Sequence, residues 1–528
     1  MQTDFDVVIV GSGPAGVSVA FPLVRSGLKV LMVDGGREEE VAPPSLPFLE
    51  GRSKDVNQWK WLVGEKFHAL KHLESVSPKL RMPSHAYVFD KFTVSNPIDS
   101  TNFIAVGSLA KGGLSNAWGA GVARLSGDEL LDFPFSESEI FRSYESVTRR
   151  IGVSGANNDD LSEYFGLDAW AQPPIGMDSL HAKIFAQYAL HREKLASRGF
   201  RLGRARMAVI SENLADRKAC DILGNCLIGC HRRAIYSAGD EVFSLLKYKN
   251  FYYQSGFIID EIESHNGIAS ARGQYKQTFT SVTAKKIALA AGTLATTRLA
   301  LMALRLTMPI SLQSCPTAAF LLWLPSMLGT QRINGFGLGQ LAFSLSLTPS
   351  IKGYGATFST CGIPVNEFVR HMPFAARYGI DFARNLLSSC LVGNIFLPGH
   401  LSSTVAQIDA NGILKIIGGY SDQVDSLLLK SSRRLRKAYR QIGAVVVPRS
   451  FIAGQPGADI HYSSTLPMRL SPTRGETNAQ GEILGLENVH IVDGACLSTL
   501  PQKPHTLTIM ANADRIGQKM ASQLLTFR

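Results

Sequence analysis

Three cysteines lie close together near the middle of the chain. Cys220, Cys226 and Cys230 have the spacing C-x5-C-x3-C and make up three of the seven cysteines. Three thiolates that converge suit an iron–sulfur centre. Zinc normally takes a fourth ligand, and His231, directly after Cys230, is poorly placed to close a tetrahedron. The alternative to a cluster is a set of buried, inert cysteines.

A glycine motif with the spacing G-x-G-x-x-G stands near the start of the chain, at Gly11, Gly13 and Gly16. In dinucleotide-binding folds the first glycine makes a tight turn, the second lets the backbone approach a pyrophosphate, and the third lets the helix pack on the strand. Asp34 follows at about the twenty-residue distance at which an acid binds the ribose hydroxyls. The motif serves both NAD and FAD.

The elements that must position this motif can be predicted from the same segment. Residues 7–10 are an apolar run typical of a buried parallel strand, 14–25 have a helical pattern that Gly27 ends, and 29–33 form a second strand. The motif lies at the very N-terminus, and its partner segments lie hundreds of residues downstream, which favours FAD. Further along, Asn266-Gly267 predicts a hairpin between 257–262 and 268–271.

Composition indicates a folded protein. The 528 residues are 45% hydrophobic and 18% charged, which argues against disorder, and the length suggests two to four structural units at about 150 residues each. The net charge of +11 suits nucleic acid, an anionic membrane or an acidic redox partner, without choosing among them. Seven cysteines are too few for a secreted disulfide scaffold, and no basic leader precedes the first strand. These features predict a cytoplasmic protein. A membrane span is not expected, since the best apolar run, 318–328, contains Pro325.

A dense glycine loop spans residues 107–121, with the sequence GSLAKGGLSNAWGAG. Here the chain resembles the glucose–methanol–choline (GMC) oxidoreductase family, in which such a loop lines the flavin. The loop is also similar to the flavin-attachment loop of pyranose 2-oxidase, where a histidine bonded to the flavin stands at the position of Ala117. The resemblance therefore implies non-covalent FAD. The loop residues that it implies as cofactor contacts are Gly112, Gly113, Ser115 and Asn116.

The C-terminal part carries the same resemblance. Residues 461–468, HYSSTLPM, resemble the family segment H-x-x-G-T-x-x-M, with Ser464 in place of the glycine. Residues 485–494 resemble the strand that ends at the flavin, which adds Asp493 to the implied cofactor contacts. Residues 504–509 resemble the start of the closing helix and contain His505.

The resemblance implies that two histidines act in alcohol oxidation, in which the hydroxyl proton is removed and a hydride passes to flavin N5. A neutral imidazole can accept a proton at physiological pH. We expect His461 to be the base and His505 to orient the hydroxyl and stabilise the developing alkoxide. The alternative is that each is a buried, hydrogen-bonded histidine without a role in the reaction.

The cysteine segment is similar to the one that holds a three-iron cluster in the bacterial FAD-dependent glucose and fructose dehydrogenases. A cluster at Cys220, Cys226 and Cys230 would make the protein a dehydrogenase that passes electrons outward, to an acceptor protein or a quinone. Without a cluster the cysteines are a structural remnant. An oxidase would deliver the electrons to oxygen instead.

The predicted fold class is α/β plus α+β, with a Rossmann-like FAD-binding domain of discontinuous segments and a substrate domain on an antiparallel sheet. We expect the FAD domain at 1–44, 91–152, 216–305 and 451–528, and the substrate domain at 45–90, 153–215 and 306–450. The expected substrate is an alcohol of a sugar or of a sugar-containing molecule such as a glycoconjugate. The competing interpretations are an oxygen-using oxidase, and a non-redox lyase or degenerate flavin-binding protein of the same fold.

Two segments bear on partners. Apolar residues recur every four positions over 374–386 beside Arg377 and Arg384, which predicts a basic amphipathic helix. This helix would lie on a membrane surface or cover the substrate site. The six basic residues of 430–440 are more typical of a solvated helix face than of a nucleic-acid patch, and no aromatic residues or recognition motif support nucleic acid.

Overall fold

The computed structural model of the chain describes residues 3–39, 42–71, 78–363, 375, 379 and 386–526. The first of the two large sheets has a parallel part, in which β1 (Phe5–Val10) lies between β2 (Val30–Asp34) and β8 (Thr278–Leu289). β5 (Phe251–Ser255) pairs outside β2, and β20 (Val489–Ile491) pairs outside β8. The parallel strands therefore run in the order β5-β2-β1-β8-β20, and they bring together segments from both ends of the chain.

The N-terminal strand–turn–helix–strand prediction is confirmed. α1 (Pro14–Arg25) connects β1 to β2, and the strand residues Val7, Val8 and Ile9 have no exposed surface. α16 (Thr506–Thr526) packs against α1, and α8 (Glu137–Ile151) packs against α16. A continuous apolar core is thus built from the N-terminal unit and the C-terminal helix.

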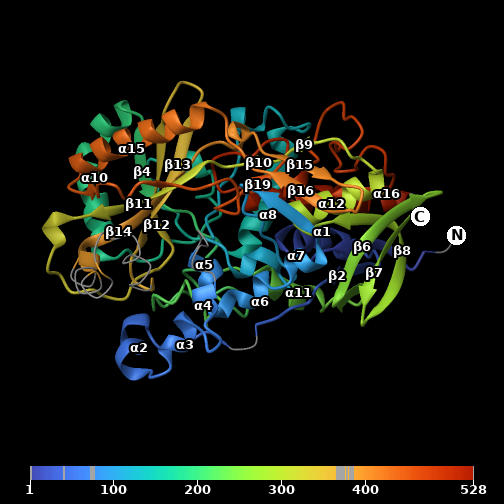
Figure 1. Cartoon of the computed structure of the whole chain (residues 1–528), viewed down its shortest axis with the longest axis horizontal. Coiled ribbons are helices and arrows are strands. Elements are labelled where there is room, and N and C mark those ends of the chain that lie inside the picture. The colour runs from blue at the N-terminus through green and yellow to red at the C-terminus, as the bar shows by residue number, and fades with distance from the viewer. Residues whose placement is uncertain are drawn as a thin grey trace.

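A three-stranded antiparallel meander extends the same sheet, as the right side of Figure 1 shows. β6 (Phe257–His265) pairs with β7 (Ile268–Tyr275), and β7 pairs with the N-terminal half of β8. The two turn residues Asn266 and Gly267 have φ angles of 52° and 79°. Positive φ at both positions matches the right-handed twist of the strands, which is why Asn-Gly predicts this hairpin correctly.

A second, antiparallel sheet lies at the opposite end of the molecule (Figure 1). α10 (Ser179–Ser197) and α15 (Gln423–Gln441) cover one face of it and form a separate core in which Tyr188, Phe343 and Tyr439 are buried. The other face lines the main cavity. The strands, in sheet order, are β17 (Val445–Val446), β11 (Thr317–Trp323), β14 (Cys390–Phe396), β13 (Lys352–Ser359), β12 (Gly339–Ser346) and β4 (Phe200–Arg204), with β18 (Ile452–Ala453) also on β11.

The basic run of 430–440 lies on α15, as predicted. Leu427, Leu435 and Tyr439 point into the core of the antiparallel sheet, whereas Lys430, Arg433, Arg436, Lys437 and Arg440 are exposed. The basic side chains therefore form the solvated face of an amphipathic helix. The predicted amphipathic helix at 374–386 lies largely outside the described residues.

Two small sheets connect the halves. β3 (Ile98–Thr101), β16 (Leu414–Ile417), β15 (Val405–Ile408) and β9 (Ile310–Ser311) form one, and β10 (Gln313–Ser314) pairs with β19 (Tyr462–Ser463) in the other. Within the described ranges, no helix is both long enough and apolar enough to cross a membrane. The remaining α-helices are α2 (Phe48–Lys54), α3 (Gln58–Leu62), α4 (His68–Lys71), α5 (Pro78–Arg81), α6 (Ala86–Phe89), α7 (Phe92–Ser95), α9 (Ser162–Phe165), α11 (Ala238–Leu245) and α12 (Thr293–Leu304).

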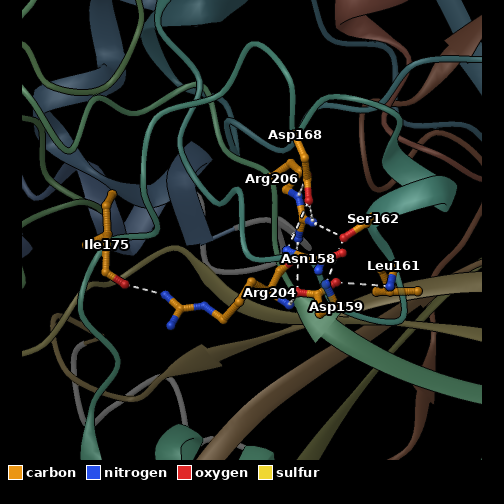
Figure 2. A network of polar contacts seen from close by, with 8 residues as sticks. All are labelled: Asn158, Asp159, Leu161, Ser162, Asp168, Ile175, Arg204 and Arg206. Carbon is orange, nitrogen blue, oxygen red and sulfur yellow. Dashed lines mark hydrogen bonds and ion pairs between the residues drawn. The ribbon is translucent and has the colours of Figure 1, made fainter.

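A buried ion-pair network ties β4 to the cavity wall (Figure 2). The guanidinium of Arg206, which has no exposed surface, donates to both carboxylate oxygens of Asp168 at 2.7 and 2.8 Å and lies 3.2 Å from Asp159. Two carboxylates offset a cation that would cost several kcal/mol if it were buried alone. The next residue, Met207, pairs with Gly121, so the network anchors the end of the glycine loop.

The predicted fold class is confirmed: a Rossmann-like α/β domain of discontinuous segments is joined to an antiparallel sheet. The boundaries between the two domains remain a prediction.

Candidate active site

A cavity of about 930 Å³ lies between the parallel and the antiparallel sheets. Its wall at one end is the glycine turn after β1, and at the other end it is the open face of the antiparallel sheet, including Ala356 and Asn394. The glycine loop of 107–121 and the two predicted catalytic histidines line the stretch between these ends. A single cavity therefore contains both the dinucleotide motif and the side chains expected to act in catalysis.

The three glycines of the first motif have different surroundings. A Cβ added at Gly11, where φ is 105°, would lie 2.3 Å from the carbonyl oxygen of Ala290. A Cβ added at Gly16 would lie 1.9 Å from the carbonyl oxygen of Gly11. At Gly13, by contrast, no atom lies within 4 Å of that position. Gly11 and Gly16 thus allow close packing of the chain, whereas Gly13 leaves open the space that a pyrophosphate needs at the N-terminus of α1.

Asp34 lies at the end of β2 and faces the cavity. Its carboxylate accepts hydrogen bonds from the hydroxyls of Tyr253, at 2.7 Å, and Ser12, and Ser12 also accepts from the Gly112 amide at 2.9 Å. Burial raises the pKa of Asp34, although both hydroxyls oppose that shift. The acid is therefore held at the place where a ribose would lie, and the same contacts join the two glycine segments.

The glycine loop packs directly on the first motif. Gly112 and Gly113 have φ angles of 88° and 59°, and a Cβ at Gly113 would lie 3.3 Å from the Cα of Gly13. The Ser115 hydroxyl donates to the Gly112 carbonyl at 2.6 Å, and the Asn116 amide donates to the Gly113 carbonyl at 2.9 Å. The polar atoms of Ser115 and Asn116 thus hold the shape of the loop, and their direct contact with a cofactor remains a prediction.

Asp493, from the C-terminal part of the chain, also lines the cavity. It follows β20 and accepts hydrogen bonds from the Gly292 amide at 2.9 Å, the Thr296 hydroxyl at 2.5 Å and the Ala495 amide at 3.0 Å. Burial raises its pKa to about 6. The carboxylate therefore joins the turn after β8 to the turn after β20 beside the predicted flavin position.

His461 and His505 meet on the cavity wall. Their rings are perpendicular, with centroids 5.0 Å apart, and the ring of Phe396 also lies 5.0 Å from that of His461. The side chain of His461 is 32% exposed, whereas His505 is buried. Burial, together with the neighbouring His461, lowers the pKa of His505 well below its usual value. His505 is consequently neutral at physiological pH.

The local backbone explains the family-like segment around His461. β19 begins at Tyr462, and the carbonyl of His461 accepts from the Cys315 amide at 3.2 Å, so the histidine is fixed at the start of a strand. Ser464 has a φ of 65°, in the left-handed region that favours glycine. The serine therefore occupies the position where the family segment has glycine and adopts the conformation that glycine would allow.

Of the three cysteines of C-x5-C-x3-C, Cys226 lies beside the cavity, and the three sulfur atoms are not all within 4.8 Å of one another. A Cβ added at the lining residue Gly337 would lie 3.4 Å from the thiol sulfur of Cys226. Burial raises the pKa of Cys220 to about 11 and that of Cys226 to about 12, so both are thiols at neutral pH. Across the part of the chain that the structure describes, the one trio of Cys, His, Asp or Glu donor atoms within 4.8 Å of one another lies elsewhere. The cluster remains a hypothesis of the sequence.

Two residues of this site were not anticipated from the sequence. Asp459 places a carboxylate oxygen 3.2 Å from Nδ1 of His461. Lys79 lines the cavity and donates to the Trp118 carbonyl, and burial lowers its pKa to about 8. The Asp-x-His spacing was a usable signal for Asp459, whereas Lys79 reaches the site only through the fold.

The fold and the cavity define a protein with the architecture of the GMC flavoprotein oxidoreductases. The model of the pyridine nucleotide-disulphide oxidoreductase family matches residues 5–88, which include the first glycine motif and Asp34. The residues of the cavity also fit FAD, since the space at Gly13 is open and an acid ends β2. The confirmed resemblance is one of fold, and the activity is a separate question.

Individual relatives span nearly the whole chain. The chain is 22% identical to the 2-methyl-1,2-propanediol dehydrogenase of Mycolicibacterium austroafricanum, over 97% of this chain and 94% of that protein. Its structure is similar to pyridoxine 4-oxidase from Mesorbium loti, with a TM-score of 0.59 and 14% identity over 98% of this chain and 99% of that one. A fungal aryl-alcohol oxidase gives a TM-score of 0.55 at 14% identity, over 99% and 100% of the two chains. Both solved structures are GMC oxidoreductases.

Proposed function

We propose that this protein is an FAD-dependent oxidoreductase that oxidises the CH–OH group of an alcohol, with His461 as the base. The observation that carries the proposal is the pair of perpendicular imidazoles on the wall of the same cavity that contains the open glycine turn. The relatives support an alcohol as substrate, because the names of all three refer to alcohols or to the oxidation of one.

In this proposal the two histidines have different roles in the reaction. FAD, when bound, supplies the hydride acceptor. His461, which is partly exposed to the cavity, accepts the hydroxyl proton as the CH–OH carbon is oxidised. His505 is buried and neutral, so one of its ring nitrogens can donate a hydrogen bond to the substrate oxygen without competing for the proton.

The substrate class within the alcohols rests on the sequence resemblance, which suggests a sugar or a sugar-containing molecule. The cavity wall contains both Asn394, whose amide can bond hydroxyls, and Phe396, whose ring lies 5.0 Å from that of His461. A panel of monosaccharides, glycosides, 1,2-diols and aryl alcohols therefore separates the proposed class from those of the relatives.

An outward path for electrons through Cys220, Cys226 and Cys230 is the second part of the proposal. Its support is that Cys226 lies against Gly337, a residue of the cavity wall, so a centre there would be close to the bound flavin. The thiols must lose their protons and draw closer together to bind iron. An oxidase is the alternative, and stoichiometric peroxide would identify it.

The test of the function is the absorption spectrum of the purified protein. We expect a flavin spectrum that bleaches anaerobically on addition of an alcohol from the panel, and yellow FAD in the supernatant after acid precipitation, because Ala117 offers no attachment histidine. Flavin retained in the pellet would contradict non-covalent binding. A bound flavin that no alcohol bleaches would instead support a lyase or a degenerate flavin-binding protein.

A further inference from the structure

We infer that Asp459 is a positioning residue for His461: it holds the Nδ1–H tautomer of the imidazole, so that Nε2 is the atom that accepts the substrate proton. The inference deepens the proposed function and rests on it, since it assigns the nitrogen that acts and the group that prepares it. Asp459 belongs to neither of the histidine segments that indicated the site.

Both carboxylate oxygens of Asp459 lie close to His461. Oδ2 lies 3.2 Å from Nδ1 of His461, and Oδ1 accepts from the His461 backbone amide at 3.3 Å. The Asp459 side chain is only 8% exposed, and Oδ2 is a buried atom that lies 3.2 Å from the ring nitrogen but makes no hydrogen bond with any residue of the described part of the chain. A carboxylate so poorly solvated is costly unless it is paired. The imidazole is the group that pairs it.

The pairing with Asp459 determines which tautomer the His461 ring adopts. A neutral imidazole carries one N–H and one lone pair, and which nitrogen carries the proton is set by the hydrogen bond that the other makes. With a carboxylate beside Nδ1, the proton stays there and Nε2 is left as an acceptor. When Nε2 takes the hydroxyl proton, the resulting imidazolium lies next to the carboxylate of Asp459, whose side chain is only 8% exposed. Asp459 therefore stabilises the charge that the reaction creates.

The other titratable groups around the pair carry no charge that would compete at neutral pH. Burial, with the nearby Asp459 carboxylate, raises the pKa of the thiol and of both phenols in this set well above their usual values. The second imidazole is neutral because burial and His461 lower its pKa. The groups in question are Cys315, Tyr420, Tyr462 and His505.

A metal ion is a less suitable partner for the same atoms. Cys315, Asp459 and His461 place one donor atom each within 4.8 Å of one another. The Cys315 thiol, however, donates to the carbonyl of Pro501 at 3.4 Å, and its raised pKa keeps the proton on sulfur. A cation would have to displace that proton and the Nδ1 proton of His461 as well. The pairing of Asp459 with His461 needs neither step.

Asp459→Asn tests the inference in the FAD-loaded enzyme, because it keeps the shape and removes the charge. We expect the limiting rate of flavin reduction to fall about 10- to 100-fold, as for other groups that orient a functional histidine, with KM nearly unchanged. The pH profile of the limiting rate should also differ from that of the wild type, because the charge beside the ring is gone. Asp459→Glu should restore most of the rate.

Asp178→Asn is the matched control. Asp178 is also a buried aspartate beside a histidine, with Oδ1 in a 2.8 Å hydrogen bond to Nδ1 of His181, and it lies at the N-cap of α10 and away from the cavity lining. Asparagine is also a good N-cap residue, so the fold should persist. This variant should keep the wild-type limiting rate and pH profile.

A second measurement does not depend on turnover. In protein labelled with ¹⁵N-histidine, the His461 ring nitrogens should show the Nδ1–H tautomer in the wild type, and a larger share of the Nε2–H tautomer in Asp459→Asn. An Nε2–H tautomer in the wild type, or a wild-type rate and pH profile in Asp459→Asn, would overturn the inference. If that wild-type behaviour accompanies an inactive His461→Ala enzyme, the proposed function survives and only the role of Asp459 is lost. If His461→Ala also reduces its flavin normally, the proposed function fails.

Discussion

The ring of His505 is perpendicular to the ring of His461, with the two centroids 5.0 Å apart. The two side chains have different surroundings. His461 is partly open to the cavity and lies beside the carboxylate of Asp459, whereas His505 is buried and its Nδ1 has no hydrogen-bond partner among the residues that the structure describes. The surroundings therefore suit one imidazole to accept a proton and keep the other neutral.

The first prediction concerns these two roles. His461→Ala should lower flavin reduction by about 10²- to 10⁴-fold with FAD still bound, the loss typical of a general base. His505→Asn, which keeps a hydrogen-bond donor, should cost less than His505→Ala. Anaerobic stopped-flow reduction with the best alcohol of the panel measures all three variants.

The pH dependence of the same reaction follows from the burial of His505. Because its pKa is lowered well below 6.5, it does not take up a proton on the acid side of neutrality. His505 should therefore add no proton to the acid limb of the pH profile of flavin reduction. A two-proton limb, or near wild-type reduction in His461→Ala, would refute the assignment.

The second prediction compares two glycines of one motif. Gly13→Ala adds a methyl group where the protein has no atom within 4 Å, so the apoprotein should keep its melting temperature. The same methyl group would occupy the space of a pyrophosphate, and FAD affinity should fall about tenfold or more. Gly16→Ala should instead destabilise the apoprotein, because its Cβ would lie 1.9 Å from the Gly11 carbonyl oxygen.

Thermal unfolding of the apoproteins and FAD titration monitored by flavin fluorescence separate these effects. If Gly13→Ala binds FAD as well as the wild type, the dinucleotide does not pass over Gly13. If Gly16→Ala is as stable as the wild type, the close packing of α1 on β1 is not required there.

The sequence predicted the N-terminal unit element by element because its signals are local. The apolar run, the glycine turn and the helical pattern that define β1, α1 and β2 all lie within about thirty residues. The two residues Asn266-Gly267 are likewise sufficient to predict the hairpin between β6 and β7. His461 and His505 could be selected because short segments around them resemble a family pattern.

The features that could not be predicted from the sequence depend on contacts that local sequence patterns do not reveal. β3 pairs in parallel with β16, and β18 pairs with β11, so strands from segments assigned to different domains share sheets. The contact between Asp459 and His461 was missed because the spacing alone did not show the carboxylate turning back to Nδ1. Whether three cysteine thiols converge depends likewise on the loop that carries them.

The third prediction uses the pKa of Asp493, which burial raises to about 6. An aspartate of the unfolded chain has a pKa of about 3.9, so between these values the folded protein keeps a proton that the unfolded chain releases. This carboxyl group therefore contributes stability that is fully present below about pH 4 and is lost as the pH rises to about 6. Two pKa units correspond to about 3 kcal/mol.

Asp493→Asn removes this titration. The free energy of unfolding of the variant apoprotein, relative to the wild type, should increase by about 2–3 kcal/mol between pH 4 and pH 7. The asparagine side chain of the variant loses some of the hydrogen bonds of Asp493, and this loss changes the free energy of unfolding equally at both pH values. Asp425→Asn, at an exposed position of α15, should show no such change. A pH-independent difference for Asp493→Asn would show that the buried carboxyl group does not titrate in this range.

The fourth prediction decides between a dehydrogenase and an oxidase through the three cysteines. Thiolates hold iron only when they converge, and C-x5-C-x3-C can bring three together without distant ligands. Anaerobically purified protein should contain iron and acid-labile sulfide. Cys226→Ser should abolish both and slow electron transfer to an added quinone, while flavin reduction by the alcohol stays intact. Cys390→Ser, at a buried cysteine of β14, is the matched control and should keep the iron. Without iron in such preparations, the thiols that burial keeps protonated are structural, and reoxidation of the flavin must occur directly.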